Sequence, residues 1–193
     1  MQKSEFEDLK NNPQFMLDLG QREEAAVKAK DVAGMYEILD TAVMLDLPAE
    51  RLNRIYTEIL QTVFDRLADK LAANSLFDLS DRSDLFTVRG IYEHGIERYS
   101  ENDFKGAKEI FLIIHHTAGD ETISEAMMPH IAAAASKMPF DDFIDELVDV
   151  ENPNESEKYG FFLTNFKPSV EGFMKEKAGV LEEALKELET LKK

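Results

Sequence analysis

The chain contains no cysteine and few residues that interrupt helices. Without thiols it cannot form disulfide bonds, thiolate zinc sites or cysteine nucleophiles. Glycine and proline contribute only nine and six of the 193 residues, and this scarcity favours helices over a turn-rich β protein. Hydrophobic residues make up 44% of the chain against 32% charged residues, a balance that allows a real core and excludes a disordered chain.

Basic residues are also scarce. Twenty-two lysines and arginines face 39 acidic residues, which gives a net charge of −17. Nucleic acids and anionic lipids are bound through lysine and arginine, so neither nucleic acid nor membrane is an expected partner. An acidic surface keeps a protein soluble, and it also favours basic segments in a polypeptide partner. No apolar run reaches the ~18 residues of a membrane span, and the N-terminal MQKSEFEDLKNNP is polar, so we expect a cytoplasmic protein.

Common catalytic motifs are missing as well. The chain has no Gly-x-Ser-x-Gly, Gly-x-x-x-x-Gly-Lys, Gly-x-Gly-x-x-Gly or His-Glu-x-x-His pattern. None of the four histidines follows a glutamate by three residues, as di-iron bundles require. We therefore expect no catalytic residues, no metal, no cofactor and no enzymatic activity. The alternative left open is a metal- or ligand-binding helical-bundle enzyme or carrier that assembles carboxylates and histidines from several helices.

Apolar spacing and capping residues predict about ten helices and no strand. In the first half, Pro13 opens a helix that runs to about Ala29, Asp31 caps one that ends near Leu47, and Pro48 opens a long third helix. A loop at 75–84 precedes helices at about 83–100 and 103–118. These signals indicate helical pairs joined by short turns.

The second half is less regular. Residues 122–125, Thr-Ile-Ser-Glu, match a capping box, and Pro129 predicts a break, a kink or a helix start. A helix from about Phe140 ends before the acidic connector 151–157, and a last helix of about 24 residues follows Pro168. We expect one all-helical domain, residues 1–193, whose C-terminal helix, 168–193, docks on it or pairs two chains as a homodimer.

Small and aromatic residues recur at helical spacing between residues 88 and 119. Gly95 and Ala107 are the small residues, Asn102 and Asp103 form a turn signal, and Phe104 and Phe111 are the apolar residues beside them. Two helices cross closely only where each lacks bulk, so Gly95 is expected to face Ala107, with Phe104 and Phe111 filling the space beside them.

This segment resembles one tetratricopeptide repeat, a helical hairpin of 34 residues. The family's first-helix tyrosine is Arg98 here, and its closing proline is replaced by Gly119 and Asp120. The resemblance implies a peptide-binding groove lined by Arg89, Tyr92, Ile96 and Tyr99, and aromatic residues and arginine are common interface anchors. These four do not supply the Lys and Asn pattern that holds chaperone tails in this family. An adaptor or chaperone-like role is implied instead, and small acidic secretion chaperones use similar hairpins.

A weaker internal similarity supports further hairpins. Residues 30–48 align without gaps on 102–120, which places Asp31 on Asp103 and Gly34 on Gly106. Residues 139–153 share only the apolar spacing. We therefore predict an all-α fold, either a helical bundle or a short irregular stack of tetratricopeptide-like hairpins.

Residues 139–157 contain eight acidic residues and no base. This pattern is typical of a solvated amphipathic helix, and the second interpretation is a docking edge for a basic partner. An aromatic cluster follows, for which we predict a core patch beneath the C-terminal helix. The cluster consists of Tyr159, Phe161, Phe162, Phe166 and Phe173.

Overall fold

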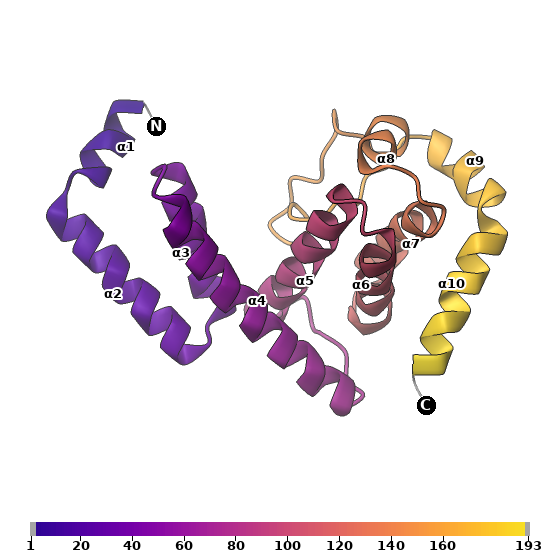
Figure 1. Ribbon diagram of the computed structural model, residues 1–193, viewed down its shortest axis with the longest axis horizontal. Coiled ribbons are helices and arrows are strands. Elements are labelled where there is room, and N and C mark those ends of the chain that lie inside the picture. Colours follow the sequence, from indigo (N-terminus) through magenta and orange to yellow (C-terminus); the bar gives the residue numbers. More distant parts are fainter. Residues whose placement is uncertain (1–2, 192–193) are drawn as a thin grey trace. The chain divides into compact units, whose positions relative to one another are not determined.

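The computed structural model describes residues 3–191 and, within them, the side chains of residues 6–188. Figure 1 labels its ten helices. This range contains no strand, only two isolated bridges, which join Phe77 to Ala118 and Val148 to Phe166. The predicted all-α class is confirmed. None of the helices between residues 3 and 191 is long and apolar enough to cross a membrane.

By their contacts, the residues form two compact units, Met1–Asp69 and Lys70–Lys193. This division is finer than the single domain that we expected from the sequence. The boundary falls in the last turn of α4 (Ala49–Ala72). Each unit has its own buried residues and is described by itself.

The first unit contains α1 (Lys3–Lys10), α2 (Pro13–Ala29), α3 (Val32–Met44) and most of α4. Asn12 caps α2, since its side-chain oxygen accepts the backbone N–H groups of Gln14 and Phe15. Asp31 caps α3 in the same way through Gly34. The predicted helix starts at Pro13, Asp31 and Pro48 are therefore confirmed within one residue. The largest fully buried side chains of this unit are Leu19, Met35, Tyr36, Ile38, Ile55 and Ile59.

The second unit begins in the last turn of α4. Its further helices are α5 (Arg82–Ser100), α6 (Phe104–Thr117), α7 (Glu121–Ala135), α8 (Phe140–Leu147), α9 (Ser169–Glu176) and α10 (Ala178–Leu191). Helix α6 packs against both α5 and α7, and α10 lies along α6 and α7 (Figure 1). The largest fully buried side chains here are Phe77, Ile91, Tyr99, Phe111, Leu112 and Phe143.

The start of α7 differs from the prediction. The cap is Asp120, whose Oδ1 accepts the N–H of Ile123 at 3.1 Å, so Thr122 and Glu125 lie inside the helix and form no capping box. An aspartate two residues earlier is an equally good cap, and it lengthens the helix by two residues. Pro129 does not end α7, because the carbonyl that it leaves without an amide belongs to Glu125, an exposed residue.

The predicted final helix is divided into α9 and α10 at Lys177. The interruption is slight, since Lys177 N–H still bonds to Phe173 O at 2.9 Å and Leu181 N–H to Lys177 O at 3.0 Å. Leu181, Ala184 and Leu188 are buried on α10. Residues 192 and 193 of the predicted helix lie outside the described range.

A long segment without helix connects α8 to α9. Its base is closed by Asp149 N–H bonding to Asn165 O at 3.0 Å and by Lys167 N–H bonding to Leu147 O at 2.7 Å. We call residues 149–165 the α8–α9 strap. The predicted acidic connector, residues 151–157, is its first half. Loops of this length without secondary structure are uncommon in compact domains and usually serve a function.

Candidate functional site

The side chains that we expected on an exposed groove are mostly buried. Arg89, Tyr92 and Tyr99 are 8%, 3% and 0% exposed, and Ile96 is half-buried. The prediction of an exposed face is therefore wrong for these first three residues. The physical reason is that other parts of the same unit cover them.

The covering segments come from later in the chain. Phe161 of the α8–α9 strap packs on Arg89, with its ring centroid 4.3 Å from the guanidinium carbon. Phe162 of the strap packs on Tyr92 with ring centroids 5.2 Å apart. From α8, Phe140 and Phe143 pack on Tyr99, at 5.3 and 5.7 Å between centroids. The predicted groove is thus filled in this structure.

Tyr92 and His130 form a hydrogen-bonded chain inside the second unit. Nδ1 of His130 lies 2.8 Å from the carbonyl oxygen of Ala126, so this nitrogen carries the hydrogen. Nε2 is then the acceptor for the Tyr92 hydroxyl at 3.0 Å. The same hydroxyl oxygen accepts the backbone N–H of Leu163, in the strap, at 3.1 Å. This chain connects α7, α5 and the strap.

Burial keeps both members of this pair neutral. His130 is fully buried, and desolvation lowers the pKa of its imidazole to about 4, although the hydrogen bond to Ala126 opposes the change. Burial likewise raises the pKa of the Tyr92 phenol. The imidazole packs against aromatic rings, with centroids 4.8 Å away in Phe143, 5.0 Å in Phe111 and 5.9 Å in Phe166.

The predicted hairpin contact exists but has a different partner. A Cβ placed on Gly95 would lie 2.9 Å from side-chain atoms of both Ile110 and Phe111, so α5 and α6 approach closely at this glycine. The partner is thus one turn beyond Ala107, which is itself fully buried. Phe111 is fully buried, and the half-buried Phe104 ring lies 6.1 Å from that of Tyr99. The likeness to a tetratricopeptide repeat stays a prediction.

Asp120 holds the middle of the strap. Its Oδ2 accepts Lys158 Nζ at 2.6 Å and the hydroxyl of Tyr159 at 3.0 Å. Burial raises the pKa of Asp120, but these bonds and the Ile123 N–H outweigh burial and leave that pKa below its usual value. The same contact raises the pKa of Lys158. The ion pair therefore fixes the strap to the start of α7.

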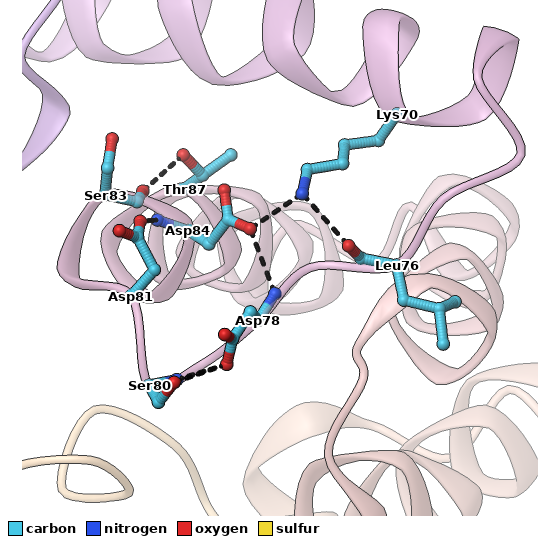
Figure 2. A network of polar contacts seen from close by, with 8 residues as sticks. All are labelled: Lys70, Leu76, Asp78, Ser80, Asp81, Ser83, Asp84 and Thr87. Atoms are coloured by element: carbon cyan, nitrogen blue, oxygen red, sulfur yellow. Dashed lines mark hydrogen bonds and ion pairs between the residues drawn. The ribbon is translucent and has the colours of Figure 1, made fainter.

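A second buried carboxylate belongs to Asp84, in the first turn of α5 (Figure 2). Its Oδ2 accepts Lys70 Nζ at 2.7 Å and the backbone N–H of Asp78 at 2.9 Å. Lys70 also donates to Leu76 O at 2.9 Å, and its ammonium lies 5.0 Å from the centre of the Phe77 ring. The network fixes the loop before α5 to the end of α4.

In the first unit, the buried carboxylate is Glu23 on α2. Arg51 binds its Oε2 through Nε at 2.9 Å and Nη2 at 2.6 Å, and Arg54 binds its Oε1 at 2.7 Å. These residues, together with Gly20, line a cleft of about 580 Å³ between α2 and α4. The arrangement connects the two helices by charge-assisted hydrogen bonds.

Two further histidines, His94 and His115, make contacts with residues near them in the sequence. His94 Nδ1 lies 3.0 Å from Glu97, as the shared helix face predicts, and His115 Nδ1 lies 2.8 Å from the carbonyl oxygen of Ser124. No three histidine, aspartate or glutamate side chains within the described part of the chain come together in a way that could hold a metal ion.

The acidic residues of 139–157 form an exposed surface. Seven of their eight carboxylates are exposed and Asp149 is half-buried. Among the described residues, none of the eight forms an ion pair with a base. Lys167 donates to the backbone oxygen of Asp145 at 2.6 Å. The carboxylates are Asp141, Asp142, Asp145, Glu146, Asp149, Glu151, Glu155 and Glu157.

The aromatic cluster after this surface packs on the helices before it. Phe162 is buried and the other members are half-buried. The rings of Phe161, Phe162 and Phe166 contact α5, α7 and α8. From the sequence, we predicted that this aromatic cluster is a core patch beneath the C-terminal helix.

Sequence reasoning missed the buried polar groups. A signal for His130 exists, because it stands alone among the apolar residues of MMPHIAAAA. Glu23 and Asp84 gave none, since their partners Arg51 and Lys70 come from other helices at distances that no motif fixes.

No protein-family model, curated protein or solved structure matches this chain.

Proposed function

We propose that this chain is a non-enzymatic protein-interaction protein of the cytoplasm, adaptor or chaperone-like, that binds a basic segment of a polypeptide partner. The observation that carries the proposal is the exposed carboxylate surface of residues 139–157. Its eight carboxylates form no ion pair among the described residues, whereas Glu23, Asp84 and Asp120 are each neutralised by a base.

Helix α8 gives this surface a fixed geometry. Phe143 and Leu147 are 0% and 2% exposed, so the helix is anchored on its apolar side. The four carboxylates of α8 lie on exposed positions and are those of Asp141, Asp142, Asp145 and Glu146. Charges on an anchored helix lose little conformational freedom when a partner binds. A partner should therefore bind this helix more tightly than it would bind a flexible tail of the same charge.

The charge balance defines the partner. Carboxylates that lie close together along the chain repel one another. A basic segment relieves that repulsion while it forms ion pairs with them. Exposed pairs contribute only ~0.2–1 kcal/mol each, so several lysines or arginines are needed and salt should weaken the complex. We include the α5–α6 hairpin, as a tetratricopeptide-like scaffold, in the proposal.

A direct test uses a labelled oligolysine peptide and fluorescence anisotropy. Changing Asp141, Asp142 and Asp145 to Asn and Glu146 to Gln removes four charges and keeps side-chain shape. We expect the Kd to rise by about tenfold, because about 1.4 kcal/mol of ion-pair energy is lost.

A matched control removes the same charge elsewhere on the second unit. It replaces four exposed glutamates by Gln, at Glu101, Glu125, Glu171 and Glu183. The control should bind the peptide as the unchanged protein does. Equal losses in both variants would mean that net charge alone attracts the peptide, and no loss in either would place the binding site elsewhere; both results reject the proposal.

A further inference from the structure

The α8–α9 strap is held on the second unit by separate contacts along its length. Lys158 and Tyr159 bond to Asp120 at its middle. Towards its end, Leu163 N–H bonds to the Tyr92 hydroxyl at 3.1 Å, beside the packed ring of Phe162. The backbone of this second part therefore depends on the state of the Tyr92 hydroxyl.

That hydroxyl has a defined direction. Because Nδ1 of His130 donates to Ala126 O, the Tyr92 hydrogen points to Nε2, and its oxygen is free to accept Leu163 N–H. A proton can enter the imidazole only at Nε2. Once it does, Nε2–H and Leu163 N–H both face the phenol oxygen, and the Tyr92 hydrogen loses its acceptor.

We propose that His130 and Tyr92 form a proton-sensitive latch, in which protonation of His130 releases residues 161–165 of the strap from α5 while α5, α6 and α7 stay folded.

The surroundings of His130 make the protonated form costly. The groups that face it are Tyr92 from α5, Phe111 from α6, Phe143 from α8 and Phe166 after the strap. None of these carries a charge, so a buried imidazolium has no counter-ion. Opening the strap removes Leu163 and Phe162 from Tyr92, the residue bonded to Nε2 of His130, and so gives water a route to that nitrogen.

The direction of the pH effect follows from the two states. In the closed state burial lowers the pKa of His130 to about 4, whereas a hydrated imidazole keeps its ordinary value of 6.5. The open state therefore binds the proton more readily between these values, and its population rises as the pH falls. From about pH 7 to about pH 5 the open fraction should increase at least about tenfold.

The anchor at Asp120 does not share this response. Its hydrogen bonds hold the pKa of Asp120 below its usual value, so its ion pair with Lys158 persists at mildly acidic pH. Opening is thus confined to the part of the strap beside Tyr92. It uncovers Arg89, Tyr92 and Phe162, and this inference is independent of the proposed basic partner.

Hydrogen exchange of the full chain tests the latch. Protection factors are measured at about pH 7 and about pH 5, corrected for the intrinsic pH dependence of exchange, for the strap amides that include Leu163 and for α6. Protection of the strap should fall about tenfold at the lower pH while that of α6 stays constant. Equal protection of the strap at both pH values, or a parallel fall in the protection of α6, would overturn the proposal. Either result can be seen in the unchanged protein, without a variant.

Two variants assign the effect to one residue. His130→Gln keeps a donor for Ala126 O and an acceptor for Tyr92 but cannot titrate, so the strap should lose its pH response. The matched control, His94→Gln, removes a half-buried histidine outside the latch and should keep it. A response that survives in His130→Gln, or disappears in His94→Gln, contradicts the latch.

Discussion

The α2–α3 and α5–α6 hairpins turn in the same way, although each belongs to a different unit. Lys30 and Asn102 take the left-handed conformation, with φ of 52° and 64°. In each hairpin an aspartate follows, and its Oδ1 caps the second helix through a glycine N–H, at 3.1 Å from Asp31 to Gly34 and at 3.0 Å from Asp103 to Gly106. The backbone bonds around both turns connect the same relative positions.

The packing beyond the turns differs. The alignment that places Lys30 on Asn102 also places Glu23 on Gly95. At Gly95 the helices of the second hairpin meet through apolar atoms of Ile110 and Phe111. At Glu23 the first hairpin presents a carboxylate to Arg51 of α4. A turn therefore fixes how the chain reverses. The residue about two turns before it decides whether the first helix meets its hairpin partner through a dry contact, as at Gly95, or binds a third helix through an ion pair, as at Glu23.

The largest expected effect is the response of the second unit to acid, through His130 of α7, the helix that packs on the second hairpin. Burial lowers the pKa of His130 from 6.5 to about 4, which at about 1.4 kcal/mol per pKa unit corresponds to about 3 kcal/mol. As the pH falls, the unfolded chain binds the proton before the folded chain does. The contribution of the neutral, buried His130 to the free energy of unfolding is therefore complete above about pH 6.5 and is lost as the pH falls from 6.5 to about 4.

Urea denaturation at a series of pH values measures this loss. His130→Gln serves as the reference, because the carboxylates of the chain titrate alike in both proteins and cancel in the difference. The difference between the two curves should grow by about 3 kcal/mol between the two pKa values. A constant difference would show that His130 does not distinguish the folded from the unfolded state.

The next effect concerns the charged contact of the first hairpin. Glu23→Ala leaves Arg51, whose side chain is 19% exposed, without its carboxylate. Breaking a pair at this depth should lower the free energy of unfolding by about 2 kcal/mol. Glu24→Ala, at the exposed neighbouring position, should change it by less than about 0.5 kcal/mol. Similar urea midpoints for the two variants would show that the Glu23–Arg51 ion pair does not stabilise the first unit.

A glycine pair tests the dry contact. Gly95→Ala places a Cβ 2.9 Å from Phe111 and Ile110, both buried, so we expect a net loss of about 1 kcal/mol despite the better helix propensity of alanine. Gly20→Ala on α2 meets nothing within 4 Å and should gain up to about 1 kcal/mol. Thermal unfolding midpoints should therefore move in opposite directions; a shift of the same sign in both would contradict close packing at Gly95.

Sequence reasoning succeeded where the cause of a structure is local. Asp31 caps its helix through a residue three positions away, and the repeated turn at Asp103 was visible by alignment for the same reason. It failed at Tyr92, which looks like an exposed anchor on its own helix. The residue that covers its hydroxyl is Leu163, 71 positions later, and no periodicity connects the two. The pairing of the buried Glu23 with Arg51 was missed for this reason too.

The smallest effect tests the turn that the two hairpins share. A lysine in the left-handed region costs about 1 kcal/mol more than glycine, whereas asparagine tolerates this region better. Lys30→Gly should therefore raise the free energy of unfolding by about 0.5 kcal/mol, after the extra freedom of glycine in the unfolded chain is subtracted, and Asn102→Gly by less. Urea unfolding of the two single variants and of the double variant measures both changes, which should add because the two positions belong to different units. A larger gain at Asn102 than at Lys30 would mean that the two turns, alike in backbone geometry, are not under the same strain.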